Sequence, residues 1–207
     1  MDGRSTKQYW EQIYQTKDTV REVSWYQDTP KTSINLILST GIGKNGSIID
    51  VGGGDSKLVD KLLELNFKNI LVLDISAKSL QNAKARLRDK AKAITWIESD
   101  VLEFETDTRF DVWHDRATFH FLTKKEDIAR YVEKAGKFLK PSGYLIISTF
   151  SVNGPKKCSG LDIRQYSEDL IKETFEKDFR LGRSFEETHT TPFSTEQNFL
   201  FSIFKRK

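Results

Sequence analysis

The sequence predicts an α/β fold in which helices cover both faces of a mostly parallel sheet. Between residues 47 and 150, short apolar runs alternate with stretches in which apolar residues recur at helical spacing. This alternation is typical of strand–helix–strand units, in which each helix returns the chain for the next parallel strand. A chain of 207 residues, 37% of them hydrophobic, fits a single domain with one core.

The expected elements follow in order along the chain. Strands are predicted at 47–51, 69–74, 94–98, 110–114 and 144–150, separated by helical stripes at 58–63, 80–87 and 128–139. Residues 1–46 are expected to form an N-terminal cap that contains two helices, at 9–14 and 33–38. After the central core (47–150), residues 151–207 are expected to form a loop, a helix at 166–175 opened by Ser167, and an antiparallel hairpin from 179–187 and 197–205 at one edge of the sheet.

Composition excludes several classes of protein. The net charge of +3 comes from bases mixed with acids, so a nucleic-acid partner is not expected. A single cysteine, Cys158, rules out an internal disulfide and fits a reducing, cytoplasmic setting. We expect neither a signal peptide nor a membrane helix, because no apolar run has the required length.

Three consecutive glycines, Gly52 to Gly54, join the first core strand to the helix that follows it. Glycines at such a turn let the backbone approach a ligand at the end of the strand. Because a glycine turn of this kind is also found with a purely structural role, the turn by itself is weak support for a nucleotide-type cofactor.

Two acids strengthen this interpretation. Asp74 ends the second strand, where a carboxylate accepts hydrogen bonds from ribose hydroxyls, and Asp100 follows the third strand, where it accepts from an adenine amino group. The carboxyl ends of parallel strands share one edge of the sheet, so these residues and the glycines predict one adenosine site. The alternative role for each acid is to cap a helix or end a strand.

The charge around the glycine turn distinguishes between cofactors. A dinucleotide fingerprint would have a third glycine where Lys57 stands. Asp50 and Asp55 flank the turn, which disfavours a pyrophosphate and favours a ligand that carries an ammonium and a sulfonium.

Five motifs resemble, in order and spacing, those of the class I S-adenosylmethionine-dependent methyltransferases. They are DVGGGDS, LVLDIS, ESDVLEF, FDVWHDRA and LKPSGYLIIS. The resemblance implies a Rossmann-like three-layer sandwich whose seven-stranded sheet has the order 3-2-1-4-5-7-6. It implies S-adenosylmethionine as cofactor and S-adenosylhomocysteine as product. Ser56 stands where many members have a further glycine.

The resemblance also implies roles for individual residues. The residues expected to contact the cofactor are Asp50, Gly52, Gly53 and Gly54 at the methionine part, Asp74 and Ile75 at the ribose, Asp100 and Val101 at the adenine, and His114.

The end of the fourth strand is expected to face the transferred methyl group. His114 has a pKa range suited to a general base, and Asp115 is a candidate to orient an amine or a histidine, so both are candidate catalytic residues. The opposing interpretation is that His114 only forms a wall. His120, between two phenylalanines, is a candidate substrate contact or a residue that fills a half-buried face. No spacing of histidine and cysteine indicates a metal site.

Two loops are expected to shape the acceptor pocket. The polar loop 151–167 follows the fifth strand and contributes Lys157 and Cys158. The upstream loop offers Trp25 and Tyr26, which are predicted either to form a lid over the cofactor or to belong to the core.

The sequence thus predicts a methyltransferase, monomeric or homodimeric, with a small-molecule acceptor slightly preferred. The alternative is a protein lysine methyltransferase, because DRATF is similar to a D-K-G-T-hydrophobic segment of some such enzymes, with Arg116 and Ala117 in place of lysine and glycine. A non-catalytic scaffold or partner subunit stays open. A nucleic-acid methyltransferase is disfavoured because HDRA replaces the N-P-P-Y type tetrapeptide, and a dehydrogenase is disfavoured by Lys57.

Overall fold

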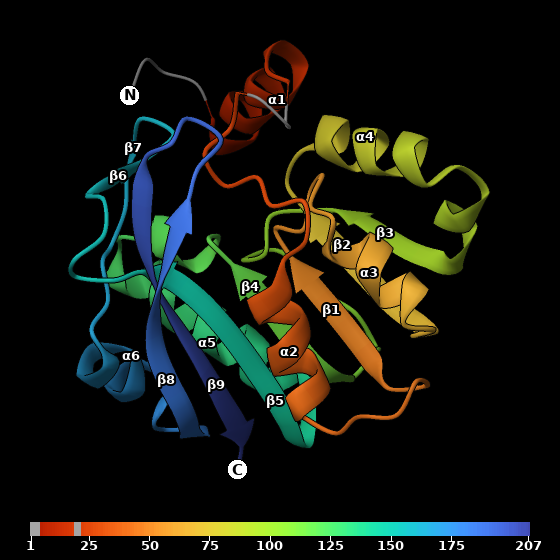
Figure 1. The fold of residues 1–207 in the computed structure, drawn as a ribbon. Helices are drawn as coiled ribbons and strands as arrows, with labels where there is room; N and C mark the ends of the chain where they lie inside the picture. Colours follow the sequence, from red (N-terminus) through yellow and green to blue (C-terminus); the bar gives the residue numbers. More distant parts are fainter. Residues whose placement is uncertain (1–4, 19–21) are drawn as a thin grey trace.

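The computed structural model describes residues 5–18 and 22–207 and contains a seven-stranded sheet (Figure 1). The order of the strands is β3-β2-β1-β4-β5-β9-β8. The strands of this sheet are β1 (Ser47–Val51), β2 (Asn69–Asp74), β3 (Ile94–Glu98), β4 (Phe110–Arg116), β5 (Leu139–Phe150), β8 (Phe179–Thr190) and β9 (Glu196–Arg206). The first five are parallel, and β9 is antiparallel to both of its neighbours. The predicted order 3-2-1-4-5-7-6 is confirmed, because two short strands outside this sheet account for the shift in numbering.

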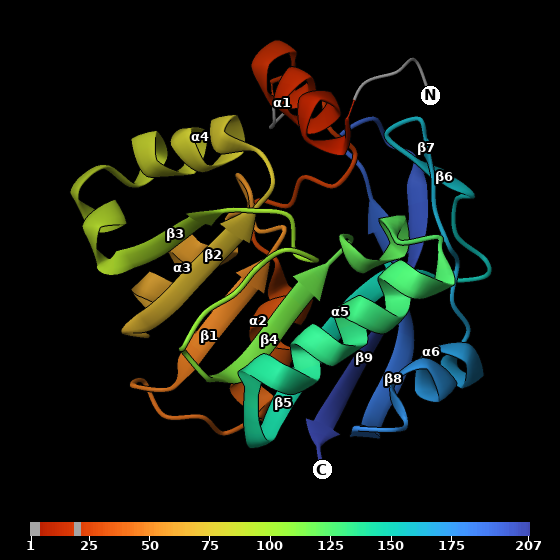
Figure 2. The same cartoon turned by 180° about the vertical axis from the view of Figure 1, so that it is seen from behind.

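Helices cover the two faces of the sheet. They are α1 (Thr6–Thr16), α2 (Lys31–Ser39), α3 (Leu58–Glu64), α4 (Ala77–Leu87), α5 (Lys125–Phe138) and α6 (Glu168–Phe175), with short 3₁₀ segments η1 (Arg88–Ala93) and η2 (Phe119–Phe121). Apolar side chains of α2, α3 and α4 pack on one face, and those of α5 and α6 pack on the other. Figure 2 shows α5 lying across the second face. This is the predicted three-layer sandwich.

Serine side chains define where three helices begin. Ser5, Ser76 and Ser167 each accept a hydrogen bond from a backbone N–H in the first turn of α1, α4 and α6, respectively. Such caps satisfy amide groups that have no partner within the helix. The predicted start of the last helix at Ser167 is confirmed.

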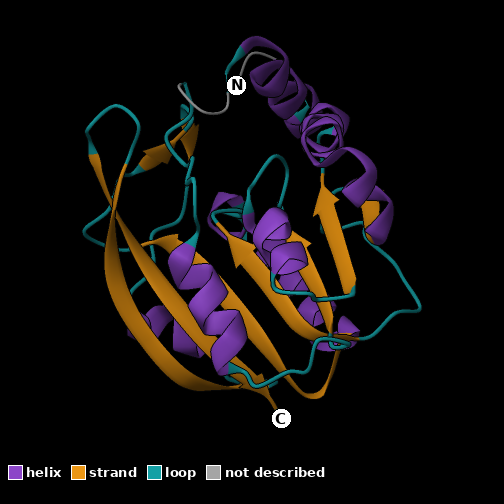
Figure 3. Ribbon diagram, turned by 45° about the vertical axis from the view of Figure 1, so that its right-hand side comes forward, coloured by secondary structure: helices purple, strands orange, loops and turns teal. Residues whose placement is uncertain are grey.

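The C-terminal hairpin forms one edge of the sheet. Its strands β8 and β9 are joined by a short turn and pair along their whole length, with a bulge between Leu181 and Arg183 (Figure 3). The loop predicted at 151–167 contains an additional small hairpin, β6 (Lys157–Cys158) with β7 (Leu161–Asp162), which the sequence pattern did not predict because two-residue strands carry no periodicity.

Of the two helices expected in the N-terminal cap, α1 lies over the carboxyl ends of the parallel strands, above their tips in Figure 1, whereas α2 packs on a face of the sheet. Glu11 anchors α1 by accepting hydrogen bonds from Ala77 N, at 2.5 Å, and Lys78 N, at the start of α4. The Tyr9 hydroxyl donates to the Ser159 carbonyl in the β6–β7 hairpin. Across the described ranges, 5–18 and 22–207, no helix is both long and apolar enough to cross a membrane.

Candidate active site

Two cavities open at the carboxyl edge of the sheet. The first lies under α1 and extends over the ends of β1, β2 and β4, past the loop after β3, to the β6–β7 hairpin, with an empty volume of about 870 Å³ that includes space open to solvent. The second, of about 590 Å³ by the same measure, lies between the glycine turn, the start of α3 and the loop before α2. Tyr14, Trp25, Gly52 and Arg116 line both, so the two cavities adjoin at these residues.

Asp74 ends β2 in the wall of the first cavity and is almost completely buried. One carboxylate oxygen accepts a hydrogen bond from Ser76 N at 2.8 Å. Burial raises the pKa of Asp74 to about 6, and the hydrogen bonds from Ser76 and Ser79 oppose this shift. A ligand with hydroxyl donors at this position would stabilise the carboxylate.

The residues after β2 and β3 complete the same wall. Ile75, Asp100 and Val101, which the sequence predicts to contact the ribose and the adenine, all line the first cavity. Asp100 also accepts a hydrogen bond from Leu102 N at 2.9 Å, and this bond stabilises the loop that follows β3. The apolar Val101 side chain is buried beside it.

Glycine is required at the turn after β1 by the protein's own packing. Gly52 has a φ of +64°, and a Cβ atom there would lie 1.8 Å from Thr118 Oγ1; at Gly53 it would lie 2.6 Å from Asp50 Oδ2. Gly52 and Gly53 line the second cavity, whereas Gly54 packs beside Tyr14 and Asp74. The turn therefore brings backbone to the cavity wall at two of the three predicted positions.

His114 and Asp50 form a buried pair at the base of the second cavity. His114 Nδ1 lies 2.7 Å from Asp50 Oδ1, and His114 Nε2 lies 2.9 Å from Ser33 Oγ. The two residues are register partners on adjacent strands β4 and β1. A carboxylate only accepts, so Nδ1 donates to it, and in the neutral ring Nε2 accepts from the serine hydroxyl. Both ring nitrogens are thus engaged.

The model of a methyltransferase domain family matches residues 42–200. The chain belongs to this family. This chain is 25% identical over 191 residues to EEF1A lysine methyltransferase 2 of Danio rerio. The match covers 86% of this chain and 81% of the relative. The chain is 26% identical over 162 residues to the eEF1A lysine and N-terminal methyltransferase of Bos taurus, and there the match covers 73% of this chain but 22% of the relative.

Among solved structures, the N-methyltransferase NodS from Bradyrhizobium japonicum, in complex with S-adenosyl-L-homocysteine, has the same fold. Its TM-score is 0.75 at 17% identity, with 98% of this chain and 99% of that chain covered. The family and fold predicted from the sequence are confirmed.

The cavity residues fit S-adenosylmethionine, the predicted cofactor of the methyltransferase. A buried carboxylate at the end of β2, an acid and an apolar side chain after β3, and the turn at Gly52 and Gly53 in the cavity wall match a ribose, an adenine and a methionine chain in turn. When bound, this cofactor supplies the electrophilic methyl group.

Asp115 occupies a different place from the one predicted. Successive side chains of a strand point to opposite faces, so Asp115 points away from His114 and toward α5. Its carboxylate accepts hydrogen bonds from Thr118 N, Phe119 N and the Tyr131 hydroxyl, at 2.9, 3.2 and 2.6 Å. Asp115 lines neither of these two cavities, and the ring nitrogens of His114 are held by Asp50 and Ser33 instead.

His120 is fully buried rather than exposed to a substrate. Its ring packs against Phe121 and Phe150, and Nδ1 accepts a hydrogen bond from Phe150 N. Burial, with the Arg116 charge nearby, lowers the pKa of His120 to about 3, so the imidazole stays neutral. Of the two interpretations of His120, the structure favours filling of the core.

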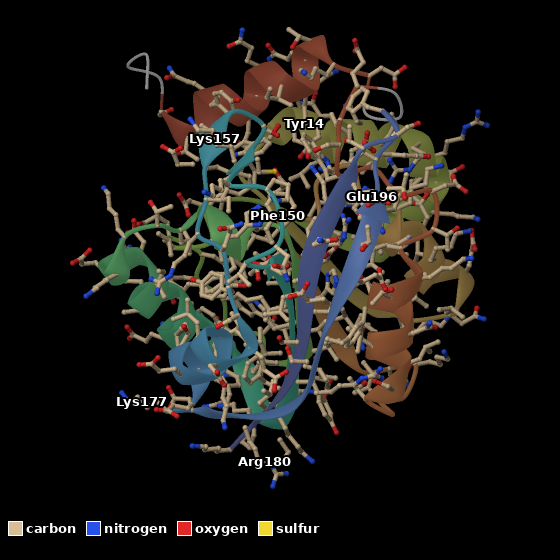
Figure 4. The ribbon with its side chains drawn as sticks, turned by 60° about the vertical axis from the view of Figure 1, so that its left-hand side comes forward. Tyr14, Phe150, Lys157, Lys177, Arg180 and Glu196 are labelled. Atoms are coloured by element: carbon tan, nitrogen blue, oxygen red, sulfur yellow. The ribbon has the colours of Figure 1, made fainter. Side chains whose placement is uncertain are left out.

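The predicted lid residues divide in a similar way. Trp25 lines both cavities and packs edge-on against Trp10 and Tyr14, while Tyr26 lines the second cavity but not the first. Cys158 lines the first cavity, and burial raises its pKa to about 11. In Figure 4, Tyr14 lies on α1 and Lys157 on the adjoining hairpin. Lys157 is exposed and pairs with Asp162 across that hairpin, outside the cavities described here.

Asp55 does not present an uncompensated charge to the ligand. Its carboxylate pairs with Arg86 of α4, which also pairs with Asp60. The electrostatic argument for a cationic ligand therefore rests on Asp50.

The sequence did not predict that Trp10, Tyr14 and Arg116 line the cavities. Trp10 and Tyr14 stand four residues apart, which places them on one face of α1, but only the packing of α1 over the sheet brings them to the cofactor cavity. For Arg116 a signal existed, because alternation along β4 gives it the same face as His114.

Proposed function

We propose that this chain is an S-adenosylmethionine-dependent N-methyltransferase whose acceptor is a protein amine, namely a lysine side chain. Among the cavity residues, Asp74 holds the ribose, Asp100 and Val101 hold the adenine, and Gly52, Gly53 and Asp50 hold the methionine part. His114 positions Asp50. The chemistry is an in-line displacement, so the main task of the protein is to align the acceptor with the methyl group.

The engagement of His114 carries this proposal. Both of its ring nitrogens are hydrogen-bonded, to Asp50 and Ser33, and Asp115 lies on the other face of the sheet. Burial also raises the pKa of Tyr14 and Cys158, which keeps the phenol and the thiol protonated at neutral pH. An acceptor that requires no base from these residues suits the site best, and a neutral amine is nucleophilic through its own lone pair.

Three aromatic side chains of the first cavity support an amine acceptor in a second way. Trp10, Trp25 and Phe121 line the first cavity, with Trp10 edge-on to the other two rings. An apolar enclosure lowers the pKa of an entering lysine and favours its neutral form. The rings also stabilise the cationic methylated product by cation–π contact.

The relatives support a protein acceptor. The Danio rerio relative, which this chain matches over most of the length of both, is named for methylation of lysine in eEF1A. The Bos taurus relative carries the same lysine activity in its name.

One observation favours the small-molecule acceptor that the sequence slightly preferred. The first cavity is roofed by α1 and closed at one side by the contact between Tyr9 and Ser159. A small acceptor can be enclosed there without a groove for a polypeptide.

The experiment that separates these functions uses S-adenosylmethionine labelled on its methyl group. The chain is incubated with a cell extract, which is then separated into protein and small-molecule fractions, with Asp74→Ala as the inactive control. Label in protein that is lost in the control supports the proposal. Label only in small molecules supports the second candidate, and no label in either fraction supports a non-catalytic scaffold.

A further inference from the structure

Arg116 ends β4 at the place where the two cavities adjoin. Its Nη1 atom donates a hydrogen bond to the Trp25 carbonyl at 3.0 Å, and its guanidinium carbon lies 4.9 Å from the centre of the Phe199 ring. Its Nε and Nη2 atoms are shielded from solvent and have no hydrogen-bond partner among the described residues. Most of the donor capacity of this side chain is therefore unused.

A partly buried guanidinium whose Nε and Nη2 atoms are shielded and unpaired favours an anion beside it. Buried polar groups are nearly always hydrogen-bonded, and a buried charge without a counter-charge is costly. The fork of N–H donors on arginine matches the two oxygens of a carboxylate. In the described part of the chain no acid lies within the 4.0 Å of an ion pair with Arg116, although the charges of Glu187 and Asp50 act on it from farther away. Neither carboxylate therefore occupies the open N–H groups of the fork.

The other cation beside the second cavity is already engaged. Lys57 Nζ lies 3.0 Å from Asp28 and 5.7 Å from the centre of the Tyr26 ring. Asp50 lines the same cavity, and its hydrogen-bond partner there is the neutral His114 ring rather than a cation. The second cavity therefore offers one anionic and one cationic side chain, Asp50 and Arg116, to whatever passes the glycine turn.

We infer that Arg116 binds the α-carboxylate of the cofactor while Asp50 attracts its α-ammonium. A methionine chain that crosses from the first cavity to the second passes Gly52 and Arg116, which line both. The zwitterionic end of that chain matches the two opposite charges. Arg116 also links this end of the cofactor to the predicted lid residue Trp25, because Nη1 donates a hydrogen bond to the Trp25 carbonyl and Trp25 lines both cavities.

Titration calorimetry with two ligands tests this inference without any acceptor. The ligands are S-adenosylhomocysteine and its decarboxylated analogue, in which hydrogen replaces the carboxylate. The wild-type chain is expected to bind S-adenosylhomocysteine about 10-fold to 100-fold more tightly than the analogue, the range for hydrogen bonds to a charged group. Arg116→Gln is expected to abolish that preference and to bind the two ligands within about twofold of each other.

Two further variants sharpen the test. Lys57→Gln is the matched control and should retain the wild-type preference, because Lys57 is paired with Asp28. Arg116→Lys keeps the charge but loses the fork, so its preference should fall between those of wild type and Arg116→Gln. This variant also tests the inference if Arg116→Gln does not fold, which circular dichroism and thermal unfolding would reveal.

Three results would overturn the inference. Equal affinity of the wild type for both ligands would show that the carboxylate is not bound. Preference unchanged in a folded Arg116→Gln would assign the carboxylate to another group, and preference unchanged in Arg116→Lys would show that the arginine fork is not what recognises it. Equal weakening of both ligands in Arg116→Gln would give Arg116 a structural role. Since no acceptor is used, each result is independent of the lysine proposal.

Discussion

His114 is a positioning residue in this account, because its ring bridges Asp50 and Ser33 at 2.7 and 2.9 Å. An asparagine at this position keeps a donor for Asp50 but removes any base. We expect His114→Asn to retain at least about a tenth of the wild-type turnover at saturating cofactor, whereas loss of a general base costs about 10²–10⁴-fold. The affinity for the cofactor should fall by a factor at least as large as the fall in turnover of this variant.

Turnover and calorimetric affinity, measured on the same preparation of His114→Asn, check this prediction. A turnover loss of 100-fold or more with unchanged affinity would identify His114 as the base. Glu103→Gln, which alters an exposed ion pair with Arg130, is the control for a change of side chain without effect on the site.

Asp115 gives the protein a dependence of stability on pH. Burial raises the pKa of Asp115 from 3.8 to about 6 in the folded state, with opposing hydrogen bonds from Tyr131, Thr118 and Phe119. The folded state therefore holds this proton more tightly than the unfolded chain. The resulting stabilisation is fully present below pH 3.8 and is lost as pH rises through about 6.

In Asp115→Asn this titration is absent. Between pH 4 and 6 the free energy of unfolding of the variant should fall less steeply with pH, by up to about 1.4 kcal/mol per pH unit. Denaturant unfolding of both proteins across that range measures the difference. Identical slopes would mean that Asp115 is ionised in the folded protein throughout.

The turn after β4 is an element under conformational strain. Ala117 has a φ of +69°, in the left-handed region that glycine favours, and it stands where the related D-K-G-T segment has glycine. Left-handed backbone costs a residue with a Cβ about 1–2 kcal/mol, part of which is offset because glycine loses more entropy on folding.

We therefore expect Ala117→Gly to raise the free energy of unfolding by about 0.5–1 kcal/mol. Ala85→Gly, on the exposed side of α4, is the matched control and should lower the free energy of unfolding by about 1 kcal/mol. Chemical denaturation of the three proteins gives both values. Destabilisation by both substitutions would contradict the strain at Ala117.

The helix α1 acts as the roof of the cofactor cavity, and Glu11 anchors it to the first amides of α4. Removal of this carboxylate loosens the roof without changing the cavity wall below. In Glu11→Ala we expect faster amide hydrogen exchange in α1 and cofactor binding about 3-fold to 10-fold weaker, the effect of losing about one hydrogen bond.

Gln15→Ala, on an exposed position of α1, is the control for the helix itself. Exchange measured by mass spectrometry, with and without S-adenosylhomocysteine, reports on both variants. Unchanged exchange in Glu11→Ala would mean that the other contacts of α1 hold the roof.

At the scale of the whole molecule, the sequence was most informative where the backbone alone determines position. Apolar runs and helical stripes located the strands and most helices, and strand ends located Asp74 and Asp100 at one edge of the sheet. These are consequences of parallel topology, which follows from the alternation of elements. The strand order itself followed from the family resemblance.

Side-chain partners were harder to predict because they depend on register and on which face a residue occupies. The Asp50–His114 pair exists because these residues are opposite each other in β1 and β4. Adjacent residues of a strand point to opposite faces, so His114 and Asp115 cannot both line one cavity. The sequence alone is enough to predict this separation. The packing of α1 and the pairing of Asp55 with Arg86 depend on tertiary contacts between distant segments.

Methyl transfer to a lysine amine, in a site where both ring nitrogens of His114 are engaged, predicts a specific product. Protein labelled with methyl from S-adenosylmethionine is acid-hydrolysed, and the amino acids are separated beside methylated lysine standards. Label that elutes with mono-, di- or trimethyl-lysine, and that is absent with Asp74→Ala, is the predicted result. Label on another amino acid, or as a base-labile methyl ester, would contradict the account.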